Sequence, residues 1–89
     1  METNKIHLAT ISILIKDRAA QAPEVNQILT KHGNIILARL GLHLGENAPE
    51  NCVAVITVVV KTTSQQISDL TKEIDQLYGV VAKSNILSD

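Results

Sequence analysis

The sequence predicts an α+β fold in which two helices cover one face of a four-stranded antiparallel sheet. Two observations lead to this prediction: four short segments have strand-like apolar patterns, alternating in the first two and almost continuous in the third, and apolar residues recur with a helical period in two other segments. The segments follow one another in the order βαββαβ, which is the ferredoxin-like, split βαβ arrangement. We expect a single domain over residues 1–89, since this length is near the small end of what folds alone.

The first part of the chain predicts a strand over residues 6–16 and a helix over residues 19–32. β-branched residues fill the strand segment, as is typical of half-buried strands. One face of the helix carries residues at three- and four-residue spacing, which are Val25, Ile28, Leu29 and His32. Pro23 suits the first turn of this helix, and Gly33 suits its C-terminal cap.

The second part predicts two strands joined by a polar loop, then a helix and a last strand. Their expected ranges are residues 34–44, 52–61, 62–78 and 80–87. The third strand is almost continuously apolar, as a central strand would be. Thr63 followed by Gln66 resembles a capping box, and Gly79 is expected to end the helix. The buried stripe of this helix is predicted to contain Ile67, Leu70, Ile74, Leu77 and Tyr78.

The face of the sheet opposite the helices is expected to be apolar. Its expected members are Leu8, Leu14, Ile35, Leu37 and several valines of the third strand. An apolar patch of this size usually marks an interface, so we expect a homodimer or a tetramer. In the second strand, Arg39, Gly41 and His43 share the parity of Leu37, and Arg39 and Gly41 are our candidates for interface residues.

Composition excludes several classes of function. The net charge is −1 and Tyr78 is the only aromatic residue, so we expect no direct binding of nucleic acid, which needs basic patches and stacking platforms. With a single aromatic residue in the sequence, the core should be aliphatic. No segment approaches the roughly 20 apolar residues of a membrane span, and the N-terminus does not resemble a signal peptide. We expect a cytoplasmic protein without membrane contact.

The sequence contains no catalytic motif that we recognise. A Walker loop, GxGxxG and HExxH are all absent, and no serine has a histidine and an aspartate near it in sequence. We therefore expect a protein that is not an enzyme and has no cofactor.

A charged corner, Lys16-Asp17-Arg18, lies between the first strand and the first helix. An aspartate at a helix start complements the helix dipole, which is a purely structural role. Alternatively, backbone N–H groups and Arg18 could bind a small anion here. Asp17 and Arg18 are therefore our candidate ligand-binding residues.

Three residues could ligate a transition metal such as nickel, copper or zinc: His32, His43 and Cys52. His32 precedes the second strand and His43 ends it, so about 30 Å separates them in one chain. They could meet only across a subunit boundary. A metal sensor is thus an alternative interpretation.

Several short motifs resemble those of small regulators associated with iron-only hydrogenase systems. The motifs are Asp17-Arg18, His32-Gly33-Asn34-Ile35-Ile36, Arg39-Leu40-Gly41 and Gly79-Val80. Such proteins are similar to ACT-type regulatory domains and to the C-terminal domain of the nickel-responsive repressor. The resemblance implies a small cytoplasmic oligomer that senses a small-molecule effector. The repressor's metal site forms between subunits, at places comparable with His32, His43 and Cys52. A third interpretation is a module that serves only protein–protein assembly.

Overall fold

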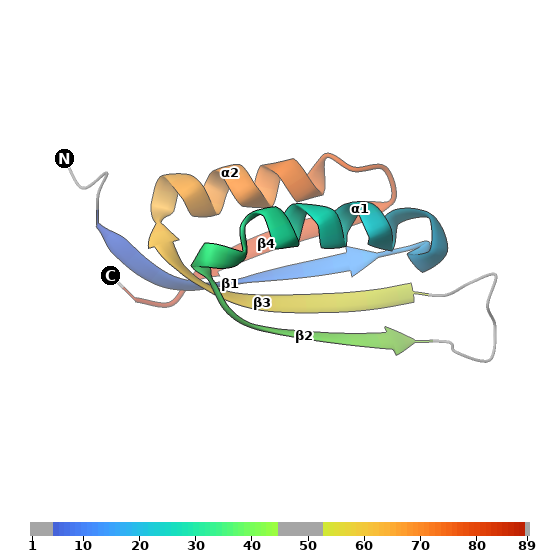
Figure 1. The fold of residues 1–89 in the computed structure, drawn as a ribbon, viewed down its shortest axis with the longest axis horizontal. Helices are drawn as coiled ribbons and strands as arrows, with labels where there is room; N and C mark the ends of the chain where they lie inside the picture. Colours follow the sequence, from blue (N-terminus) through green and yellow to red (C-terminus); the bar gives the residue numbers. More distant parts are fainter. Residues whose placement is uncertain (1–4, 45–52, 89) are drawn as a thin grey trace.

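The computed structural model contains one antiparallel sheet with two helices on one of its faces (Figure 1). It describes residues 5–44 and 53–88. The elements are β1 (Ile6–Ile15), α1 (Arg18–Lys31), the 3-10 turn η1 (Gly33–Ile35), β2 (Ile36–Leu44), β3 (Val53–Thr63), α2 (Ser64–Asp75) and β4 (Val80–Ile86). The strand order is β2-β3-β1-β4, so β2 and β4 are the edges. The predicted α+β, ferredoxin-like class is confirmed.

The core lies between the sheet and the helices and is aliphatic throughout the described residues. Odd-numbered residues of β1 and even-numbered residues of β3 alternate into it, as the period of two requires. The helices contribute Val25, Leu29, Ile67, Leu70 and Ile74. α2 packs over β4 and β1, and α1 lies over β1, so edge strand β2 is the least covered (Figure 1).

Both helices begin at side-chain caps. Asp17 caps α1 by accepting a hydrogen bond from the N–H of Ala20, and Thr63 caps α2 by accepting one from Gln66. Because Asp17 is the cap residue, α1 begins at Arg18, and Pro23 lies inside the helix beyond its first turn. The prediction that Pro23 would lie in the first turn was wrong.

Two further expectations about helix ends were wrong. Gly33 was expected to cap the C-terminus of α1, but the cap residue is His32, and the φ of Gly33 is not positive. Among the described residues, Gly79 alone has a positive φ, at 77°. α2 ends at Asp75, so Tyr78 lies in the turn that follows and is 91% exposed rather than buried.

A β-bulge changes which face the residues of β2 occupy. Ile36 pairs with Val60, but Ala38 pairs with the adjacent Val59, so Leu37 is an extra residue in the strand. Arg39 and Gly41 consequently pair with Val58 and Ile56, whose side chains are buried beneath the helices. Strict alternation had placed these two residues on the open face with Leu37, and that assignment was wrong. Ile35, also expected there, packs against the core.

Candidate functional site

The charged corner is held together by its own hydrogen bonds. The Asp17 carboxylate accepts from the N–H of Ala20 at 3.4 Å, and the N–H of Asp17 donates to the Oε1 atom of Gln21 at 3.1 Å. The N–H groups of Ala20 and Gln21 also donate to the carbonyl of Asp17. These three N–H groups are therefore already used within the corner, and the cap accounts for Asp17.

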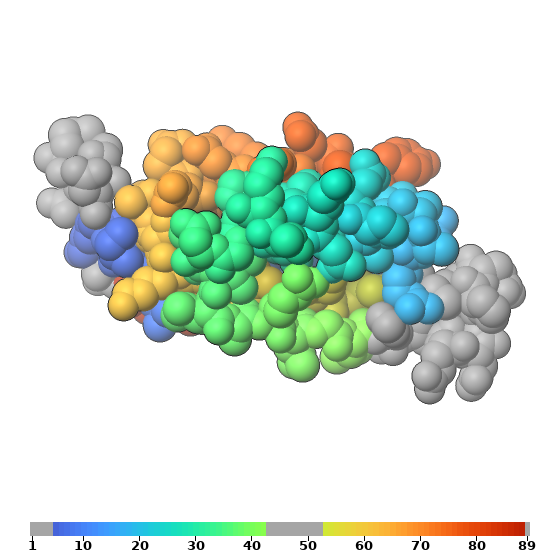
Figure 2. All heavy atoms as spheres, in the orientation of Figure 1, coloured from blue at the N-terminus to red at the C-terminus, as the bar shows by residue number. Residues whose placement is uncertain are grey.

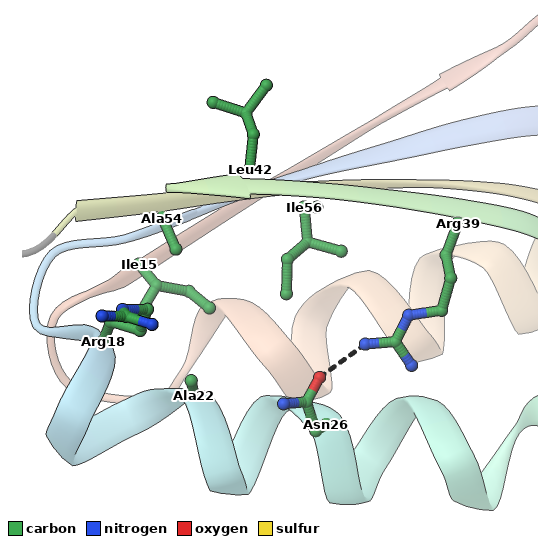
Figure 3. Close-up of a pocket in the computed structure, with 9 residues that line it drawn as sticks. Ile15, Arg18, Ala22, Asn26, Arg39, Leu42, Ala54 and Ile56 are labelled. Carbon is green, nitrogen blue, oxygen red and sulfur yellow. Dashed lines mark hydrogen bonds between the residues drawn. The ribbon is translucent and has the colours of Figure 1, made fainter. Parts of the chain in front are cut away.

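Arg18 belongs to a cleft between α1 and the edge strand β2 (Figure 3). The cleft has a volume of about 310 Å³. It is lined by Ile15, Arg18, Ala22, Asn26, Arg39, Gly41, Leu42, Ala54 and Ile56. In the space-filling view, β3 remains visible between α1 and β2, so the helix leaves this side of the sheet partly open (Figure 2).

Local geometry explains why α1 presents these residues together. Arg18, Ala22 and Asn26 succeed one another at every fourth position, so they lie along one line of the helix surface. From β2, the bulge turns Arg39 and Gly41 toward the same space. Three of the four residues selected separately from the sequence, Arg18, Arg39 and Gly41, are thus brought to one cleft, and Asp17 lies outside it.

Two arginines give the described lining of the cleft its charge. Among the residues that the structure describes there, Arg18 and Arg39 are the two charged ones. The Nη2 group of Arg39 donates to the Oδ1 atom of Asn26, which crosses the cleft from β2 to α1 (Figure 3). A guanidinium carries five N–H donors in a rigid fork, so this single bond orients Arg39 while most of its donors remain for an anion.

Gly41 keeps the middle of the cleft open. A β-carbon at this position would lie 3.7 Å from the Cγ1 atom of Ile56, which is ordinary van der Waals contact. The backbone therefore tolerates a side chain at residue 41, but that side chain would occupy the cleft. The glycine thus leaves space there that the fold itself does not need.

A second polar cluster joins the C-terminal end of α1 to α2. The Oε2 atom of Glu73 accepts from Lys31 at 2.9 Å, and its Oε1 atom lies 3.2 Å from the Nε2 atom of His32. The hydrogen bond from the Lys31 ammonium lowers the pKa of Glu73, and His32 acts in the same direction, while partial burial opposes them. The arrangement explains His32 as a link between helices.

The three metal-ligand candidates are not gathered in the described residues. His32 precedes η1, His43 pairs with Ala54 near the far end of β2, and Cys52 lies outside the described residues. Within residues 5–44 and 53–88, no group of three or more His, Cys, Asp or Glu residues is placed to hold a metal ion. A site that used both histidines would need a second chain, because the length of β2 separates them.

The open face of the sheet carries an apolar row that crosses all four strands. Strand register aligns Leu42 with Val55, Val55 with Leu14, and Leu14 with Val81. A shallow hollow of about 190 Å³ lies along this row. Leu40 on the same face is 68% exposed, and Leu42 is 47% exposed. This face is therefore apolar, as expected, although in β2 it is formed by Leu40 and Leu42.

Sequence reasoning missed Ala22 and Asn26, which complete the α1 side of the cleft. Their four-residue spacing from Arg18 was a usable signal. No signal in the sequence indicated that they lie close to Arg39, because this proximity depends on the bulge at Leu37.

The comparisons with known proteins agree on one family. A family model described as TM1266-like, iron-only hydrogenase system regulator, matches residues 7–84. The solved structure of the TM1266 protein from Thermotoga maritima is 30% identical and superposes with a TM-score of 0.83, covering 94% of this chain and 100% of that one.

A protein from Galdieria sulphuraria shares only the fold, at 13% identity and a TM-score of 0.68, over 92% of this chain and 50% of that one. No curated protein sequence matches the chain. Among the described helices, none is long and apolar enough to cross a membrane. The match over most of its length shows that the chain belongs to the TM1266-like family of iron-only hydrogenase system regulators.

Proposed function

We propose that this chain is a regulatory domain without enzymatic activity, which assembles into a homo-oligomer and senses a small anionic effector. The family description supports a regulatory role. The observation that carries the proposal is the cleft between α1 and β2, whose described lining combines an apolar floor with the side chains of Arg39, Arg18 and Asn26.

The cleft has the properties of a small-ligand site. Such sites are concave, largely apolar and equipped with a few convergent polar groups, and their volumes begin near 300 Å³. Here an apolar floor of Ile15, Ala54 and Ile56 lies beneath two guanidinium groups and the Asn26 amide. Guanidinium groups bind carboxylates and phosphates through paired hydrogen bonds, so the site favours an anion.

The apolar open face of the sheet supports the second half of the proposal, which is self-association. Four strands spaced at about 4.8 Å, with about ten residues at 3.3 Å each, span roughly 600 Å² in projection. A standard interface buries about 800 Å² of accessible surface on each partner, so the face is of suitable size. The row from Leu42 to Val81 would form the apolar centre of that interface.

The cleft and the open face lie on opposite sides of the sheet. Arg39 and Gly41 share their face with buried Val58 and Ile56, whereas Leu40 and Leu42 share theirs with Thr57 and Val55. A ligand in the cleft would thus touch the same strand that contributes to the oligomer interface. A change in the position of β2 on binding is the physical route by which an effector could change assembly.

Thermal denaturation at constant ionic strength tests effector binding with chloride, acetate, phosphate and glutarate as probes. We expect at least one multivalent anion to raise the melting temperature of the wild type, and this rise to vanish in Arg39→Gln. A Lys61→Gln variant, which removes a positive charge from β3 outside the cleft, is the matched control. Equal loss of the response in both variants would contradict a specific site.

A further inference from the structure

We propose that a hollow beside Tyr78 is a docking site for an acidic segment of a partner protein, in which a carboxylate meets Lys16 and a neighbouring apolar side chain covers the tyrosine ring. This surface is separate from the cleft between α1 and β2 and from the open face of the sheet. Three features of the hollow support the proposal: a buried amide with an unused donor, a lysine without an ion pair, and an exposed tyrosine.

The hollow has a volume of about 320 Å³ and lies at one end of the molecule. Its described lining comes from the corner between β1 and α1 and from the turn between α2 and β4, which Figure 1 shows at the same end of the ribbon. The lining residues are Lys16, Asp17, Gln21, Tyr78 and Gly79. A hydrogen bond of 3.0 Å from the N–H of Lys16 to the carbonyl of Gly79 joins the two segments, so their relative position is set by the backbone.

Gln21 offers a hydrogen-bond donor to the hollow. Its side chain belongs to a residue that is only 9% exposed, and its Oε1 atom accepts from the N–H of Asp17 at 3.1 Å. The Nε2 atom lies against Gly79, and no described residue accepts a hydrogen bond from it. An amide nitrogen carries two N–H donors, so an acceptor atom of a ligand would gain this bond without displacing a contact within the described part of the chain.

Lys16 adds a positive charge at the edge of the hollow. Its side chain is exposed, and no described carboxylate forms an ion pair with it. Asp17 is the one acidic residue of the described lining, and its carboxylate accepts from the N–H of Ala20 at the start of α1, where the helix dipole offsets its charge. The ammonium of Lys16 and the amide of Gln21 are both donors, so the complementary group is a carboxylate.

Tyr78 favours a protein segment over a small free anion. It is 91% exposed and is the only aromatic residue of the chain. Tyrosine is enriched among the residues that contribute most to protein–protein binding, because its ring buries a large area at a low cost in conformational entropy. A segment with an apolar side chain beside its carboxylate covers the ring and reaches Lys16 together. Because α1 supplies Gln21, the hollow lies on the helix side of the sheet, and a second copy on the open face would leave it accessible.

Tyr78 is also the reporter for the test, since the full chain has no other aromatic residue that fluoresces. The probe is the acetylated and amidated tripeptide Leu-Glu-Leu, compared at one ionic strength with Leu-Gln-Leu and with acetate. We expect Leu-Glu-Leu to change the tyrosine fluorescence in a saturable way and to bind roughly threefold to fivefold more tightly than Leu-Gln-Leu, which is the difference that one exposed ion pair supplies. Acetate at the same concentrations should leave the fluorescence unchanged.

Two variants at exposed or half-buried positions assign the charge. Lys16→Gln should bring the two peptides to equal affinity. Lys72→Gln removes a positive charge from α2 outside the hollow and should leave the difference between the peptides unchanged. Thermal unfolding of both variants checks that they keep the wild-type fold.

The remaining outcomes each contradict the proposal. No response to either peptide, equal affinity of both peptides for the wild type, or an equal loss of discrimination in both variants would overturn the site. An equal response to acetate would assign the hollow to a free carboxylate, and a change in Tyr78 fluorescence on dilution of the protein alone would assign it to a second copy. Anion binding in the cleft is measured separately by the melting temperature, so failure here leaves the proposed function standing.

Discussion

Replacing Gly79 by alanine should destabilise the fold more than any other glycine substitution in the described residues. Gly79 has a φ of 77°, a region in which an L-residue with a side chain costs roughly 1–2 kcal/mol. A β-carbon there would also lie 2.6 Å from the Nε2 atom of Gln21. Gln21 is buried and its Oε1 atom accepts from the N–H of Asp17, so moving it endangers a hydrogen bond worth about 1 kcal/mol.

The two contributions add to about 2–3 kcal/mol of lost stability. In a domain of this size, each kcal/mol lowers the melting temperature by roughly 4–8 °C, so we expect a decrease of about 8–24 °C. Far-ultraviolet circular dichroism during thermal and urea unfolding measures both quantities. The chain concentration must be held constant, because self-association would shift the midpoint.

Gly33→Ala is the matched control. A β-carbon at Gly33 meets no atom within 4 Å and φ is not positive, so stability should change by less than about 0.5 kcal/mol. Gly79→Ala in a Gln21→Ala background should retain only the backbone cost. If Gly79→Ala changes stability no more than Gly33→Ala does, the reasoning about this turn is refuted.

Four further predictions concern the cap, the helix link, the open face and the metal. Asp17→Ala removes the α1 cap and should lower the free energy of unfolding in urea by about 0.5–2 kcal/mol, whereas Asp17→Asn should keep most of this stability. An equal loss of stability in both variants would rule out capping. The pKa of Glu73 is lowered in the folded state, so the stability that this carboxylate contributes is present above its ordinary pKa of 4.5 and is lost as pH falls through the folded pKa. This contribution should amount to about 0.2–1 kcal/mol, and Glu73→Gln should flatten this part of the pH profile of stability. An unchanged profile would refute the link between the helices. Leu14→Lys should shift sedimentation velocity toward monomer, whereas Gln27→Lys on the exposed side of α1 should not, and an unaltered oligomer in Leu14→Lys would locate the interface elsewhere. Native mass spectrometry should show no nickel adduct on the oligomer, and a stoichiometric adduct that His43→Ala removes would favour the metal sensor instead.

The order of elements could be predicted from the sequence because periodicity records which residues face the core. The alternation in residues 6–16 and the helical spacing of Ile67, Leu70 and Ile74 were both reliable. Tyr78 was misplaced because helical spacing continues in the sequence beyond Asp75, where the chain turns. Gly79 indicated the turn in the sequence, but the helix ends four residues before this glycine, and its φ of 77° belongs to the turn that follows.

The candidate site could be predicted residue by residue but not as a cleft. Arg18 was selected for its place at a helix start, and Arg39 and Gly41 for their place on an exposed strand. A single bulge at Leu37 moves the latter two to the helix side, and a one-residue slip in a strand exchanges its faces. No pattern in the residues around Leu37 indicates that bulge, since alternation continues through it in the sequence.

The central claim is that the cleft between α1 and β2 binds an anionic effector. A titration of the isotope-labelled chain with the multivalent anion that raises the melting temperature most, followed by two-dimensional amide NMR, tests this claim most directly. We expect the largest shift changes at Ala22, Arg39, Gly41 and Ala54, with small changes along the open face at Leu14 and Val81. Changes confined to the open face, or no change at anion concentrations that saturate the rise in melting temperature, would contradict the account.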